Sequence, residues 1–177
     1  GNQDYNTLEQ AGFDLWNQKQ NSPRWSLITK GNHGHSTLTV DDSRFKVDAS
    51  ATIIDFKELP VPEATIDMSD IFSGHLASAI RKFTKDTDHS VVIEENVVLT
   101  DSTKSLTWAI MTKAEVIPTE YGAMLSQDGK TFELRVLSPS GIETSVIMLD
   151  PPPTVFDRKI DGLKRVELRI PAYTIKE

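Results

Sequence analysis

Two histidines, His33 and His35, lie two residues apart at the start of a segment whose pattern predicts a strand over residues 35–40. In that segment leucine and valine alternate with threonine, which is typical of a strand with one buried face. Side chains two apart on an extended backbone point the same way, so we expect both imidazoles on one side of this strand. They could share a zinc ion, but a zinc site needs three or four ligands. The pair therefore indicates either part of a metal site or two polar residues at a strand mouth.

The segments before the histidine strand must position it. Apolar residues recur at helical spacing over about residues 6–20, and Asn6 with Glu9 forms a capping-box pattern. Together these features predict a short N-terminal helix. Pro23 is expected to end that helix, and the aromatic segment 24–29 is predicted to be a strand.

Downstream of the histidine strand, the sequence alternates between short predicted strands and turns. Asp41, Asp42 and Ser43 favour a hairpin turn. Further strands are predicted at 44–48, 50–57, 77–84, 105–112, 131–137 and 163–170. About a dozen strands separated by turns predict an all-β fold, an antiparallel β-sandwich with a short N-terminal helix. We expect a single domain over residues 1–177.

Composition limits the classes of function. The net charge is −7, so the chain lacks the basic surface that nucleic-acid binding requires. There are no cysteines, which excludes disulfides and thiolate metal sites. No apolar run approaches the roughly 20 residues of a membrane span. The chain begins with Gly rather than Met, which indicates a processed protein or an excised piece.

Two segments carry a resemblance to a known family. These are His35-Ser36-Thr37-Leu38-Thr39-Val40 and Ala51-Thr52-Ile53-Ile54-Asp55-Phe56. They resemble two strands in the C-terminal β region of the heparinase II/III-like polysaccharide lyases, whose supersandwich architecture would then apply here. Residues 2–9 also resemble the tail of that family's Asp-Leu-Gly-x-x-x-Tyr motif, with Gly1 at its glycine and Tyr5 at its tyrosine.

The resemblance implies a β-eliminating enzyme that acts on uronate-containing, acidic polysaccharides in the bacterial periplasm or outside the cell. It places the catalytic residues in a helical domain upstream, which would be the partner of this region within one parent chain. It assigns no catalytic residue here, because Thr37 stands where the family's His-x-His-x-Asp motif has its aspartate. His35 matches a zinc-binding histidine whose partner ligands would precede Gly1. Zinc is thus expected in the full-length protein and not in this fragment alone, which we expect to be inactive.

Other residues that could carry chemistry have simpler interpretations. Trp25 and Trp108 alternate with apolar neighbours and are predicted to be core, while Trp16 is predicted to anchor the helix. Tyr5 is predicted to be a packed aromatic at the helix start. His75 and His89 are expected in solvated loops. The acidic pairs 41–42 and 94–95 lack the ligand spacing of a calcium loop and are expected in solvated turns or bulges. The basic residues Lys113, Lys130, Arg135, Lys164, Arg165 and Arg169 are expected on outward strand positions.

Two alternatives to the lyase interpretation stay open. A free-standing carbohydrate-binding sandwich would bind glycan through exposed aromatic residues. A structural or interaction module would bind neither glycan nor metal. The sequence does not specify which glycan is recognised.

Overall fold

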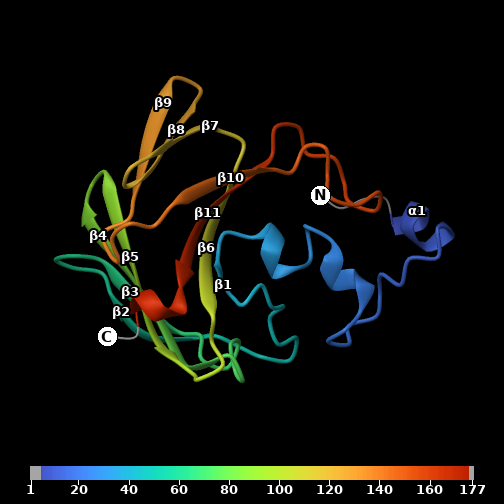
Figure 1. The fold of residues 1–177 in the computed structure, drawn as a ribbon, viewed down its shortest axis with the longest axis horizontal. Coiled ribbons are helices and arrows are strands. Elements are labelled where there is room, and N and C mark those ends of the chain that lie inside the picture. The colour runs from blue at the N-terminus through green and yellow to red at the C-terminus, as the bar shows by residue number, and fades with distance from the viewer. Residues whose placement is uncertain (1–4, 176–177) are drawn as a thin grey trace. The chain divides into compact units, whose positions relative to one another are not determined.

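The structure, a computed structural model, describes residues 5–175. It is mostly β, with antiparallel sheets and one short N-terminal helix, which confirms the predicted fold class (Figure 1). Among these residues, no helix has the length and apolar character needed to cross a membrane.

The N-terminal helix, α1 (Tyr5–Gln10), is much shorter than the predicted 6–20. Gly12 stops it by adopting a positive φ of 74°, a conformation that glycine tolerates best. The amide of Phe13 then donates to the Leu8 carbonyl (2.9 Å) and that of Gly12 to the Glu9 carbonyl (2.9 Å). This pair of bonds is a Schellman motif, which closes the last turn of a helix.

The chain divides into two compact units. One comprises the chain up to Arg44 and from Lys104 onward, and the other comprises Phe45–Thr103. That residues 1–177 act as one domain stays a prediction.

The first unit is built on a four-stranded antiparallel sheet, here called sheet A. Its order is β1-β6-β11-β10. The strands are β1 (Leu38–Val40), β6 (Ser105–Thr112), β11 (Lys164–Pro171) and β10 (Thr144–Met148). The order brings strands that are far apart in the sequence side by side, as the pairing of β6 with β11 shows (Figure 1). The alternation of 105–112 and 163–170 predicted β6 and β11 almost to the residue.

A three-stranded sheet, sheet C, packs against part of the apolar face of sheet A. It consists of β7 (Glu115–Thr119), β8 (Gly122–Gln127) and β9 (Lys130–Arg135), paired in that order. Between the two sheets, Val166 of β11 packs in one cluster with Ala123 and Leu125 of β8. A second cluster joins the N-terminal segment to the rest of the unit, with Leu8, Leu15, Leu27, Phe13 and Phe156 in contact.

The predicted strand 24–29 is wrong. Residues 23–26 form a 3₁₀ helix, η1 (Pro23–Ser26), with two more at η2 (Asn32–Gly34) and η3 (Ala172–Ile175). Ser22 caps η1 by accepting a hydrogen bond from the Arg24 amide at 3.1 Å, and Pro23 occupies the first helical position. Both features favour a helix start over a strand.

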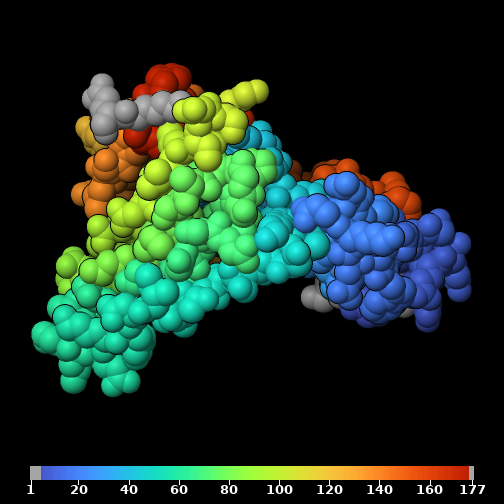
Figure 2. Space-filling view, turned by 90° about the horizontal axis from the view of Figure 1, so that it is seen from below, coloured from blue at the N-terminus to red at the C-terminus, as the bar shows by residue number. Residues whose placement is uncertain are grey.

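The second unit is a four-stranded antiparallel meander, sheet B, in the order β2-β3-β4-β5. Its strands are β2 (Thr52–Lys57), β3 (Glu63–Asp67), β4 (Leu76–Thr87) and β5 (Ser90–Leu99). The predicted strands 50–57 and 77–84 are thus confirmed, whereas 44–48 is not a strand. Every residue of β2 is exposed, and its surface is visible in teal in Figure 2.

Candidate functional site: the histidine turn and the charged strand β11

The histidine pair does not lie on one face of a strand. Residues Asn32–Gly34 form η2, and His35 follows as its C-cap, with its amide donating to the Asn32 carbonyl at 3.1 Å. Regular pairing begins only at Leu38. The expectation that both imidazoles point to one side is therefore wrong, because the backbone between them is not extended. The residue between them must be glycine because the backbone packs closely there: a Cβ at Gly34 would lie 1.7 Å from the Ile28 carbonyl oxygen.

His35 is exposed. Among residues 5–175, no group of three or more His, Cys, Asp or Glu side chains is arranged to hold a metal ion. The described residues therefore do not complete a zinc site around His35. Its role as a zinc ligand stays a prediction. The motif segment 1–4, which includes Gly1, lies outside the described residues.

His33 is half-buried and is held against strand β11. Its carbonyl accepts a hydrogen bond from the Arg165 guanidinium. Burial, reinforced by the positive charge of Arg165, lowers the pKa of the His33 imidazole below its ordinary value of 6.5. A hydrogen bond with the Ser26 backbone and the carboxylate of Asp157 oppose that shift of the pKa only in part. The fold therefore favours a neutral imidazole at this position.

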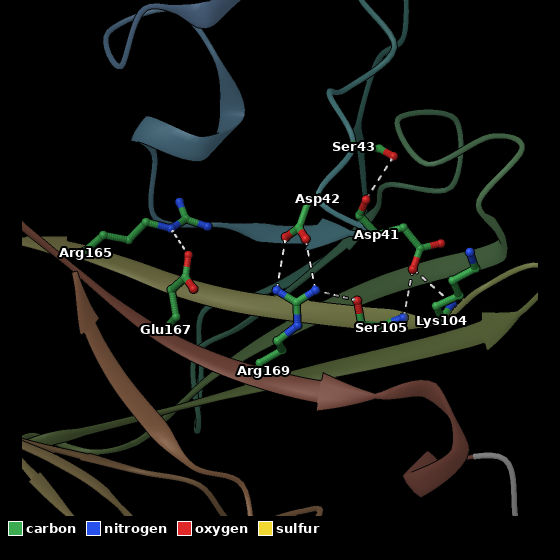
Figure 3. Close-up of polar contacts among 8 residues, drawn as sticks. All are labelled: Asp41, Asp42, Ser43, Lys104, Ser105, Arg165, Glu167 and Arg169. Carbon is green, nitrogen blue, oxygen red and sulfur yellow. Dashed lines mark hydrogen bonds and ion pairs between the residues drawn. The ribbon is translucent and has the colours of Figure 1, made fainter. Parts of the chain in front are cut away.

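Strand β11 carries three charged side chains that point the same way. Figure 3 shows Arg165, Glu167 and Arg169 projecting from one side of the strand, which alternation requires. The Arg165 Nε donates to the Glu167 Oε1 at 2.6 Å, and these side chains are only 7% and 19% exposed. Lys164, on the other face, is also buried and donates to the Ala114 carbonyl at 3.0 Å. The prediction that Lys164 and Arg165 serve only as outward, solubilising residues is wrong.

The Asp41–Asp42 turn fastens the end of β1 to two other strands. Both aspartates have positive φ (51° and 54°), and the Ser43 amide donates to the Val40 carbonyl at 2.9 Å. This is the geometry of a type I′ turn. The turn is therefore confirmed, but the predicted hairpin is not, because residues 44–48 do not return as a strand. The Asp41 Oδ1 accepts hydrogen bonds from two successive backbone amides at the start of β6, those of Lys104 (2.9 Å) and Ser105 (2.8 Å) (Figure 3).

Asp42 completes the attachment by pairing with Arg169 of β11, with 2.9 Å between Oδ2 and Nη2. Both side chains of this pair are more than half exposed. The aspartates were expected to be solvated. Asp42 is indeed exposed, but the Asp41 carboxylate binds the two backbone amides at the start of β6 and so fixes the position of that strand end.

These contacts define what the arrangement can do chemically. The three charges of β11 are each engaged with a carboxylate, a guanidinium or a carbonyl. A pair of ions held this way stabilises strand positions and is not poised to transfer a proton. The alternating signs of Arg165, Glu167 and Arg169 are a sequence signal that could have predicted ion pairing along β11, because residues two apart share a face.

The aromatic predictions divide. Trp25 and Trp108 are half-buried, whereas Trp16 is 58% exposed and is not the predicted helix anchor, since α1 ends before it. Trp16 instead packs against Tyr5, with ring centroids 5.3 Å apart, and its indole N–H donates to the Glu9 carboxylate. Tyr5 is itself 40% exposed, so the pair forms an aromatic surface patch.

In the second unit, His89 is exposed as expected. His75 is half-buried rather than solvated, and its carbonyl accepts a hydrogen bond from the Thr103 hydroxyl at 2.7 Å. Glu95 is not solvated: it pairs across the strands with Arg81 of β4, at 2.7 Å between Oε1 and Nε. These two side chains are 18% and 11% exposed.

Neither a scan against protein-family models nor a search of curated proteins finds a match to this chain. The resemblance to the lyases therefore depends on the residues quoted for it and on the mostly-β architecture.

Proposed function

We propose that this chain is the C-terminal β region of a bacterial, periplasmic or secreted polysaccharide lyase similar to heparinase II/III. The observation that carries the proposal is that the two matching segments contain strands β1 and β2 within an antiparallel, mostly-β fold. The two strands belong to different sheets, so the likeness is one of local sequence and strand order.

The proposed reaction is β-elimination on a uronate-containing glycan. A base removes the proton beside the carboxylate, the bond to the glycosidic oxygen breaks, and an acid protonates the departing oxygen while a double bond forms. A positive group must neutralise the carboxylate as negative charge develops. We assign these roles to a helical domain of the parent chain. This region would form a wall of the cleft and present His35 to zinc.

The test begins by sequencing the coding region upstream of Gly1 and expressing the whole protein that it encodes. We expect a long helical domain and an increase in ultraviolet absorbance, from the unsaturated product, when the protein acts on acidic glycans. A start codon immediately upstream, or a whole protein that binds acidic glycans without producing that absorbance, would overturn the proposal.

Zinc content provides an independent check on His35. In the whole protein, His35→Ala should lower the bound zinc measured by elemental analysis, whereas His89→Ala, at an exposed histidine of the other unit, should not. Equal zinc in both variants would remove His35 from the site.

A second candidate function is glycan binding by this region itself. The exposed Tyr5–Trp16 pair favours it, because flat aromatic faces suit the apolar faces of sugar rings. Binding of oligosaccharides to the isolated chain, followed by calorimetry, tests this candidate without reference to lyase activity.

A further inference from the structure

An open groove of about 590 Å³ lies within the first unit, between β6 of sheet A and the β8–β9 hairpin of sheet C. The residues that matter for its chemistry are Ile110, Thr112, Leu125, Gln127, Lys130 and Phe132. Its size falls within the range of small-molecule sites in proteins.

The groove lies at the end of β6 that extends past β1. β1 pairs with β6 only as far as Leu38 opposite Trp108, while β6 continues to Thr112. Ile110 and Thr112 share the face of Trp108 that is turned toward sheet C. On the β1 side, the Thr37 carbonyl and the Ser36 hydroxyl accept hydrogen bonds from the amides of Ala109 (3.0 Å) and Met111 (2.9 Å). On that face, Leu125 of β8 and Phe132 of β9 line the groove together with Ile110 and Thr112.

Phe132 is the main exposed apolar group of the groove. It faces Leu125 across the β8–β9 pair, on the side of sheet C that carries the core residue Leu134 two positions further along. Phe132 is nevertheless 55% exposed. An aromatic ring on an inward strand position that nothing covers is a ready surface for a flat, partly apolar ligand.

Polar groups of both kinds surround that ring. The β8–β9 turn places Gln127 opposite Lys130, and the Gln127 amide donates to the Asp128 carboxylate at 3.3 Å. The turn is fixed by positive φ at Asp128 (52°) and Gly129 (72°), which is the type I′ hairpin geometry. No hydrogen bond or ion pair within residues 5–175 engages the Lys130 ammonium. The rim therefore offers a donor cation, a carboxylate acceptor and an amide.

We propose that this groove binds a pyranose ring of a glycan, with the apolar face of the sugar on Phe132 and its hydroxyl groups on Gln127, Asp128 and Lys130. A sugar ring has one flat C–H face and a perimeter of groups that both donate and accept hydrogen bonds, which matches an aromatic floor with a mixed polar rim. This site deepens the glycan-binding candidate above and rests on it, but it is separate from the Tyr5–Trp16 pair and has no part in the lyase chemistry.

The test is calorimetric titration of the chain with a neutral glucan oligosaccharide and with oligogalacturonate. Phe132→Ala should weaken binding about tenfold or more, because it removes the stacking surface. Phe132→Tyr keeps the ring and should restore most of the affinity. Phe56→Ala is the matched control, because Phe56 is a phenylalanine of similar exposure (65%) on sheet B.

Lys130→Met distinguishes a uronic acid from a neutral sugar as the ring that the groove binds. A larger loss for oligogalacturonate than for the neutral sugar supports a uronate unit with its carboxylate on Lys130. Equal losses support a neutral unit, and both results support a pyranose site in the groove.

Other outcomes overturn the proposal at distinguishable levels. If Trp16→Ala abolishes binding and Phe132→Ala does not, the groove assignment is wrong while glycan binding by the chain stands. If the unaltered chain binds neither oligosaccharide, both the groove and the glycan-binding candidate are wrong. Circular dichroism of each variant confirms that a lost affinity does not come from a lost fold.

Discussion

Sheets A and B are both four-stranded and antiparallel, yet they are buried very differently. All three residues of β1, in sheet A, are buried, including the polar Thr39. Every residue of β2, in sheet B, is exposed, including Ile53 (64%) and Phe56 (65%).

The difference arises from what lies on each face. In sheet A, sheet C packs against part of the apolar face, and the N-terminal segment contacts the other face through the Asn32 amide on Thr39 and the His33 carbonyl on Arg165. In sheet B, the register places Ile53, Phe56 and Ile93 on one face, and all three stay exposed. Alternation thus identifies the faces of a strand, but the coverage of each face depends on segments far away in the sequence.

The largest expected effect comes from truncating an apolar residue in each sheet. Leu38→Ala should lower the free energy of unfolding by about 3 kcal/mol, because Leu38 is 1% exposed and its removal leaves a cavity. Ile53→Ala should change it by less than about 0.5 kcal/mol. Urea denaturation measures both.

Tryptophan fluorescence follows the first unit, which contains all three tryptophans, and circular dichroism follows the whole chain. If Ile53→Ala lowered the free energy of unfolding as much as Leu38→Ala does, sheet B would be covered in solution, and the two sheets would not differ in burial.

A second pair of substitutions compares covered and exposed charges within sheet A. Glu167→Gln should cost about 2 kcal/mol, because it leaves the buried Arg165 guanidinium without its anionic partner. Asp42→Asn should cost under about 1 kcal/mol, because its pair with Arg169 is open to water. Urea denaturation in low and high salt distinguishes them further, since only the exposed pair should lose its contribution as salt is added. Equal costs would show that the N-terminal segment does not shield Arg165.

Much of the strand content could be predicted from the sequence. The alternating runs predicted β6 and β11 almost to the residue. The segment 24–29 failed because an aromatic, partly apolar run resembles a strand unless the Ser-Pro cap before it is given more weight. The helix predicted over 6–20 is too long because apolar spacing does not register Gly12, whose positive φ ends the helix two residues after Gln10.

The candidate site was less predictable. The sequence marked His33 and His35, but their geometry depends on the close approach of Gly34 to the Ile28 backbone, which spacing does not reveal. The burial of Arg165 requires two segments separated by more than a hundred residues to meet. Phe132 lies in the predicted strand 131–137, but its 55% exposure is a property of the packing between strands, which alternation within one strand does not reveal.

The smallest expected effect is a pH dependence that sharpens the same comparison on the covered face of sheet A. The pKa of His33 is lower in the fold than its ordinary value of 6.5, chiefly because the ring is half-buried and faces Arg165. Below pH 6.5 the His33 imidazole is therefore protonated in the unfolded chain while it stays neutral in the folded chain. The free energy of unfolding decreases as the pH falls toward the pKa of the folded state. The contribution is fully present above 6.5.

We expect the urea midpoint, followed by tryptophan fluorescence, to decrease as pH is lowered from about 7.5 to about 5, and His33→Gln to flatten that decrease. Nearby Asp157 opposes the shift of the pKa and Arg44 adds to it, so the measurement needs a variant at the imidazole itself. His89→Gln, at an exposed histidine of the other unit, is the matched control and should leave the pH profile unchanged. An unaltered profile in His33→Gln would mean that the imidazole is solvated in both states and that the segment around η2 does not stay closed over β11.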